Sequence, residues 1–96
     1  MARARLVLHE KQVGEDGSII EAKIWSVPSS SLYPDGVKYS LVYIQGGSRM
    51  LGYDNAHGSH HRHYLRESQP YRFINIQALF RDFRRNLKRI RREEQK

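Results

Sequence analysis

The C-terminal part of the chain carries a long amphipathic repeat, and this repeat limits what the rest of the chain can fold into. Its apolar residues recur at intervals of three or four, the spacing that places side chains on one side of an α-helix. They are Ile76, Leu79, Phe80, Phe83, Leu87 and Ile90. Asn75 is a suitable N-cap, so we predict a helix over about residues 75–94. Such a helix needs an apolar surface to cover, which the preceding residues must supply.

The preceding residues form short strand-like segments separated by turn signals. We predict two successive hairpins and a short fifth strand, over residues 3–12, 19–27, 38–45, 48–55 and 60–64. Residues 66–71 are expected to be a connection, because they contain Pro70. The predicted fold class is α+β: an antiparallel sheet of four to five strands, within residues 3–64, covered by one long C-terminal helix. A chain of 96 residues suits a single domain, residues 1–96.

Composition narrows the classes of function. The chain has no cysteine, which excludes a disulfide framework, a thiolate metal site and a cysteine nucleophile. No apolar run is long enough to span a bilayer, and the N-terminal residues lead into a strand pattern rather than a signal peptide. We therefore expect a cytoplasmic protein with no membrane partner.

The net charge of +7 is concentrated at the C-terminus. Residues 81–96 carry eight Lys or Arg against three acids, an excess typical of proteins that contact nucleic acid or an acidic partner. Exposed helix cations are also often merely solvated, and that alternative stays open. The cations that we predict to bind RNA are Arg72, Arg81, Arg84, Arg85, Lys88 and Arg92.

Four of the five histidines lie between Tyr53 and Tyr64: His57, His60, His61 and His63. Imidazoles suit zinc, nickel and copper, but this spacing matches no standard zinc motif. We therefore predict no resident metal and no cofactor. Chance capture of a transition metal by His57 and His60 is an open alternative, as is a hydrolase that uses a divalent metal at Asp54 and the histidines.

The same stretch holds the groups that metal-independent RNA cleavage needs. A histidine can act as general base or acid, and an arginine can stabilise the charged phosphorane. In this scheme His61 or His63 moves protons, Arg62 binds the phosphate and Asp54 orients a histidine. Tyr53 or Tyr64 stacks a base or donates a proton. For any one of these residues, an ordinary surface role is the competing interpretation.

Strand parity sets a geometric condition on this scheme. In a regular strand His61 and His63 point to one face and Arg62 to the other. If Arg62 and His63 act on one phosphate, the chain must bend or bulge after Gly58. Otherwise another cation must hold the phosphate, and Arg72 is the next candidate.

The order of these features resembles the TumE family, the toxin component of a proposed bacterial and archaeal toxin–antitoxin system. The most specific part is Gly-Tyr-Asp-Asn, followed by a glycine and then His-Arg-His. The motifs that carry the resemblance are Asp16–Glu21 with Ile24 and Trp25, Tyr39–Tyr43, Leu51–Asn55, Gly58, His61–His63 and Pro70–Phe73. The resemblance implies a small toxin that acts on RNA or translation and pairs with a helix-turn-helix antitoxin encoded beside it.

Residues and resemblance together predict a type II toxin that acts as a metal-independent endoribonuclease, similar to an mRNA interferase. On this hypothesis His63→Ala and Arg62→Ala abolish toxicity and leave thermal stability nearly unchanged. The rival hypothesis is a non-catalytic module that binds nucleic acid or an acidic partner through the helix. RNA cleavage in EDTA distinguishes the two. The oligomeric state is open, with a homodimer as one option.

Overall fold

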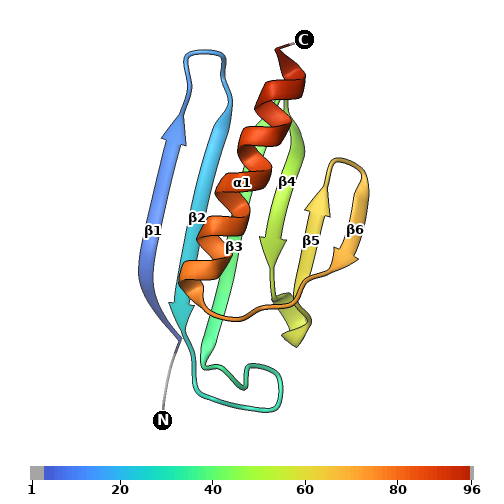
Figure 1. Cartoon of the computed structure of the whole chain (residues 1–96). Coiled ribbons are helices and arrows are strands. Elements are labelled where there is room, and N and C mark those ends of the chain that lie inside the picture. The colour runs from blue at the N-terminus through green and yellow to red at the C-terminus, as the bar shows by residue number, and fades with distance from the viewer. Residues whose placement is uncertain (1–3, 96) are drawn as a thin grey trace.

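The fold is a six-stranded antiparallel sheet with one helix across one face (Figure 1). The structure is a computed structural model, and it describes residues 4–95. Neighbouring strands in the sequence are also neighbours in the sheet, in the order β1-β2-β3-β4-β5-β6. A 3-10 turn, η1, covers Ala56–Gly58, and the helix α1 covers Ile76–Glu94. The strands are β1 Arg5–Val13, β2 Ile19–Ser26, β3 Val37–Gln45, β4 Ser48–Asp54, β5 His61–Tyr64 and β6 Glu67–Pro70.

The predicted class is confirmed, but the prediction of four to five strands was wrong. Residues 66–71, predicted to be a connection, contain the sixth strand, so the sheet continues to Pro70 rather than ending at residue 64. The four residues of β6 are all exposed and include no large apolar side chain, so they give no strand pattern. Proline is tolerated there because β6 lies at the edge of the sheet.

The helix is held by its cap and by its apolar stripe. The Asn75 side chain accepts a hydrogen bond from the Ala78 amide at 2.8 Å, which confirms the predicted N-cap. Leu79, Phe83 and Ile90 are buried against the sheet. Each large side chain buried in this way stabilises the fold by roughly 1.5–3 kcal/mol. Within residues 4–95, no helix is long and apolar enough to cross a membrane.

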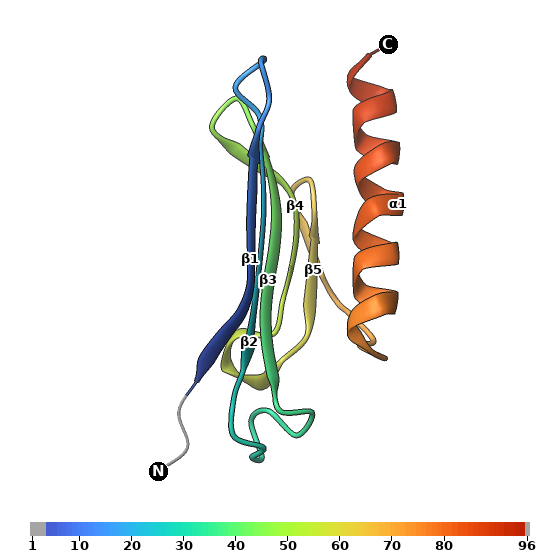
Figure 2. The same cartoon turned by 90° about the vertical axis from the view of Figure 1, so that its left-hand side faces the viewer.

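The sheet has two unlike faces, because cross-strand partners point to the same side. Toward the helix lie the buried side chains Ala22, Ile24, Tyr39, Leu41, Tyr43, Leu51 and Tyr53. The opposite side, here called the open face, has no helix over it in the described part of the chain (Figure 2).

The register between β4 and β5 decides which candidate residues reach the open face. Tyr53 pairs with Arg62, and both belong to the helix side. Gly52 pairs with His63 and Asp54 pairs with His61, and these four belong to the open face. The fifth strand is therefore regular across His61–His63, without the bend that a shared Arg62–His63 site would need.

Candidate functional site

Asp54, His61 and His63 come together on the open face. Asp54 ends β4, and the two histidines lie on the neighbouring strand β5. The two imidazole rings have centroids 6.4 Å apart. All three residues are partly exposed, so a ligand can reach them.

His63 is paired with Asp54. Its Nε2 lies 3.4 Å from Asp54 Oδ2, with 21% and 27% of the two side chains exposed. The other carboxylate oxygen, Oδ1, accepts the Ala56 amide at 3.2 Å, which fixes Asp54 at the start of the η1 turn. The contact with Asp54 involves Nε2 of the His63 ring and leaves Nδ1 outside it.

His61 has a defined tautomer when it is neutral. Its Nδ1 lies 3.0 Å from the Ser59 carbonyl oxygen. A carbonyl can only accept, so Nδ1 carries the proton and Nε2 holds the free lone pair. The two rings thus present one available nitrogen each, which is what a base and acid pair requires.

An arginine that sequence reasoning missed completes this group. The register between β3 and β4 shifts by one residue, so that Arg49 pairs with Ile44 while Leu51 pairs with Tyr43. Ile44 belongs to the open face, and Arg49 therefore joins it. A methyl group added at Gly52 would lie 3.1 Å from Arg49 Cδ and 3.6 Å from His63 Cδ2. The Arg49 side chain thus runs over Gly52, beside His63.

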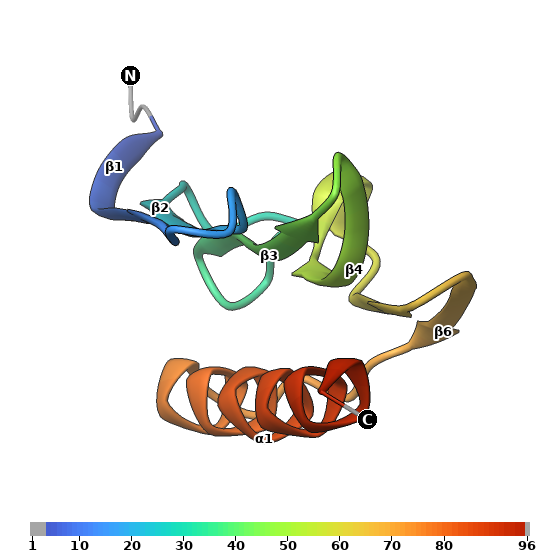
Figure 3. The same cartoon turned by 90° about the horizontal axis from the view of Figure 1, so that it is seen from above.

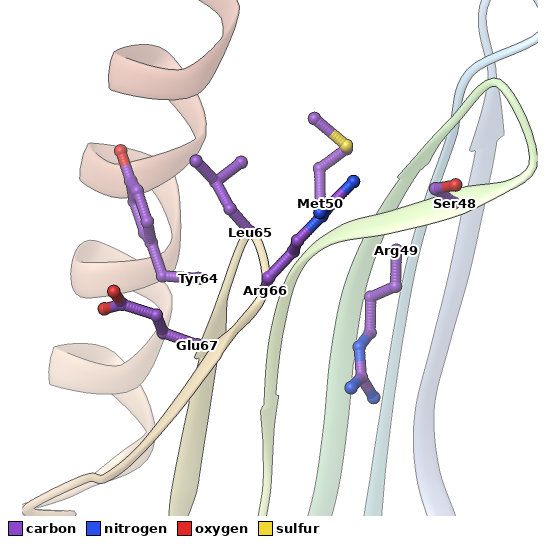
Figure 4. Close-up of a pocket in the computed structure, with 7 residues that line it drawn as sticks. All are labelled: Ser48, Arg49, Met50, Tyr64, Leu65, Arg66 and Glu67. Carbon is purple, nitrogen blue, oxygen red and sulfur yellow. The ribbon is translucent and has the colours of Figure 1, made fainter.

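In Figure 4 the Arg49 side chain lies on the side of β4 away from Tyr64 and the helix. Simple alternation along β4 would place Arg49 with Leu51, on the helix side. The bulge in β4 moves Arg49 to the open face instead. No residue pattern in the sequence predicts this bulge. Gly52 was the one available signal, because a glycine inside a strand often marks a close approach of other groups.

The Arg62 side chain lies on the helix side of the sheet and contacts other side chains there. Its guanidinium donates to Gln69 Oε1 on β6 and lies over the Tyr64 ring, 5.8 Å from the ring centroid. It also approaches the Tyr53 hydroxyl. Because these partners face the helix, Arg62 and His63 lie on opposite faces of the sheet. One phosphate group cannot contact both side chains.

Tyr53 belongs to the core. Only 1% of it is exposed, and its hydroxyl accepts a hydrogen bond from Asn86 on the helix. Its ring meets Tyr71 edge-on at 4.9 Å, and burial raises the pKa of the Tyr53 hydroxyl. Tyr53 therefore fixes the helix to β4 and presents no ring for a base to stack on.

His57 and His60 also lie apart from the open-face group. His57 is exposed in the η1 turn, with a positive φ of 59°. His60 stacks on Phe73, with ring centroids 5.0 Å apart, and its Nδ1 is hydrogen-bonded to the Tyr39 hydroxyl at 2.7 Å. Burial lowers the pKa of His60. Within residues 4–95, no three His, Asp or Glu side chains are placed so that together they could hold a metal ion.

The basic residues of α1 are exposed. The helix lies on one side of the sheet (Figure 3), whereas the histidine group, formed by Asp54, His61 and His63, belongs to the open face on the other side. Asp82 pairs with Arg85 and lies 3.7 Å from Arg81, and Arg89 pairs with Glu93. Arg84, Lys88 and Arg92 are exposed as well, and so is Arg72 in the connection to the helix. These cations and the histidine group therefore form two separate surfaces.

The open face carries further cations that extend from the histidine group. One row across the sheet runs from Lys23 through Ser40 to Asp54 and His61. In the next row toward the loop end of β3, Lys38 pairs with Trp25, and its ammonium lies 5.5 Å from the Trp25 ring centroid. A cation beside an aromatic ring suits contact with a nucleic acid strand. Sequence reasoning did not connect Trp25 with the histidines.

Comparison with known proteins gives one match. No curated protein and no solved structure matches the chain. The family model described as "Toxin TumE" matches residues 3–91, which span the sheet and most of α1 and include every open-face residue described above. The chain therefore belongs to the TumE toxin family.

Proposed function

We propose that this toxin is a metal-independent endoribonuclease whose site is the open face. Its family supports the toxin role. The observation that carries the cleavage proposal is the convergence of Asp54, His61, His63 and Arg49 on one exposed surface. We further propose that it acts in the cytoplasm and is neutralised by a helix-turn-helix antitoxin, its partner in a type II pair.

In the proposed reaction, RNA supplies its own nucleophile. One histidine accepts the proton of the 2′-hydroxyl while the 2′-oxygen attacks the adjacent phosphorus. The bond from phosphorus to the 5′-oxygen breaks, and the second histidine gives that oxygen a proton. The products are a 2′,3′-cyclic phosphate and a free 5′-hydroxyl.

Arg49 takes the phosphate-binding role in this scheme, in place of Arg62. Its side chain lies over Gly52 next to His63, so its guanidinium can hold a phosphate between the strands. Removing a donor of this kind typically lowers the rate about 100- to 1,000-fold. Lys23 and Lys38 hold the neighbouring backbone, and Trp25 provides a stacking surface. The cations of α1 attract RNA at a distance.

The test is cleavage of RNA by the purified protein in EDTA. We expect the wild type to cleave and His61→Ala and His63→Ala to lose cleavage. The matched control is His57→Ala, an exposed histidine of the same stretch that lies outside the group. Cleavage by both site variants at the wild-type rate would contradict the proposal.

The open-face cations and Trp25 also favour a second candidate, a non-catalytic RNA-binding module. It predicts binding with a steep salt dependence and no cleavage by the wild type. Cleavage that EDTA abolishes would instead indicate a divalent metal at Asp54 and the histidines.

A further inference from the structure

A groove runs between α1 and the β1–β2 hairpin, on the opposite side of the sheet from the histidines. The helix lies over the middle of the sheet, and β1 curls away from it (Figure 3). The hollow between α1 and the β1–β2 hairpin has a volume of about 320 Å³. Its floor is apolar and is formed by Ile20 and Ala22 of β2 with Phe80, Phe83 and Leu87 of α1.

Charged residues line the rim of this groove unequally. Arg84 and Arg91 of the helix lie along one wall, and Glu10 and Gln12 of β1 lie along the other. Arg84 forms no ion pair with any residue of the described chain, 4–95. The groove therefore combines an apolar floor with an excess of positive charge at its helix side.

The fold buries Ala22 and Phe83 of the floor, but it leaves the other apolar floor residues partly exposed. Phe80 and Leu87 contact the core but remain partly exposed. The outer edge of β1 also has no strand partner within residues 4–95. An apolar surface that stays exposed and is rimmed by polar residues is typical of a protein-binding site.

We propose that this groove binds an amphipathic helical segment of a partner protein, with leucine-like side chains against the floor and acidic side chains against Arg84 and Arg91. Charge complementarity selects acidic residues, because Arg84 has no ion pair within residues 4–95 and the groove is lined by a single acid, Glu10. Arg91 adds positive charge at the same wall, although its guanidinium also lies over the Tyr43 ring. The floor selects polypeptide over RNA, since aliphatic side chains such as Ile20 and Leu87 offer a phosphate or a base edge no hydrogen-bond partner. A helix laid into an apolar groove is a common way to bind such segments.

The binding test uses a fluorescein-labelled peptide of leucine and glutamate at helical spacing, with oligouridine as a competitor. We expect saturable binding of the peptide, weakened about tenfold or more by Arg84→Glu. The matched control is Lys88→Glu, one turn further along the helix. It makes the same charge change at an exposed residue outside the groove, so we expect less than about a threefold effect. Arg84→Gln, a milder change at the same position, should weaken binding in the same direction.

Backbone amide shifts of the labelled protein locate the bound peptide. We expect the peptide to shift Ile20, Ala22, Phe80 and Leu87 and to leave the β5 histidines unchanged. Equal loss of binding in the Arg84→Glu and Lys88→Glu variants would overturn the proposal, because it indicates general charge attraction. Displacement of the peptide by oligouridine, shifts confined to the open face, or no peptide binding at all would overturn it as well.

Discussion

Gly52 is the residue on which the geometry of the histidine group depends most directly. Its lack of a side chain lets Arg49 pass over the strand beside His63. The backbone of Gly52 lies within a regular strand, so alanine is tolerated there as far as φ and ψ are concerned. The space for Arg49, and not backbone conformation, is therefore what this glycine provides.

We predict that Gly52→Ala lowers the cleavage activity without lowering the stability of the fold. The new methyl group would stand 3.1 Å from Arg49 Cδ, so the arginine must move, while the strand loses a flexible residue. Cleavage should fall about tenfold or more, and the midpoint of thermal unfolding should stay the same or rise. Full activity in a folded Gly52→Ala protein would show that the position of Arg49 is immaterial.

His60 should make the stability of the fold depend on pH. Burial against Phe73 and Tyr39 lowers its pKa below the ordinary value of 6.5, although Asp35 opposes this shift and His61 adds to it. The unfolded chain then binds a proton at a pH where the folded chain does not. Stability is therefore complete above about pH 6.5 and falls as the pH drops from there toward the lowered pKa.

The measurement is the thermal midpoint of the wild type and of His60→Gln across this acidic range. We expect the midpoint of the variant to depend less on pH, because glutamine does not titrate. An identical pH dependence in both proteins would mean that other groups account for it.

At the scale of elements, the short connection after β4 links the open face to the core. Asn55 is only 2% exposed. Its side chain accepts the Tyr39 amide and donates to the Val37 carbonyl, both at 2.9 Å. These bonds hold the start of β3 against the end of β4, at the residue that follows Asp54 in the chain.

We predict that Asn55→Ala costs about 2 kcal/mol or more of unfolding free energy, because it leaves a buried donor and a buried acceptor without partners. The comparison is Asn75→Ala, which removes the helix cap and should cost about 1 kcal/mol. Urea unfolding measures both. A cost for Asn55→Ala no greater than that for Asn75→Ala would contradict this assignment.

The elements also show which features a sequence can reveal. The helix from Ile76 to Glu94 and the two hairpins produce periodic apolar patterns, and they were predicted within one or two residues. The strand β6 has no such pattern, because it is an exposed edge whose backbone pairing alone makes it a strand. Local sequence also carries no sign of the bulge in β4, since the bulge depends on how that strand aligns with β3.

The same distinction applies to the site. Asp54, His61 and His63 could be predicted, because their density and parity are visible in the sequence. Arg62 was grouped with them on the condition that the chain bends after Gly58, but the strand is regular, and Arg62 lies on the opposite face as strand parity predicts. Arg49 was missed for the converse reason, because only the shifted register brings it near His63.

At the scale of the whole molecule, the sheet separates the surfaces to which we assign different functions. The histidine group and its nearby lysines occupy the open face. The other side is the one that α1 covers (Figure 2), and it carries the groove and the exposed cations of the helix. A toxin arranged in this way can bind a partner protein on the helix side while its proposed active site remains distant from that contact.

The central claim is that RNA is cleaved on the open face, and two arginine variants test it most directly. The measurement is the initial rate of oligoribonucleotide cleavage in EDTA by Arg49→Ala and Arg62→Ala, at a temperature where circular dichroism shows both proteins folded. We predict that Arg49→Ala cleaves about 100-fold or more slowly than the wild type. The rate of Arg62→Ala should stay within a few fold of the wild-type rate. Loss of cleavage in Arg62→Ala with a normal rate in Arg49→Ala would place the reaction on the helix side and contradict the claim.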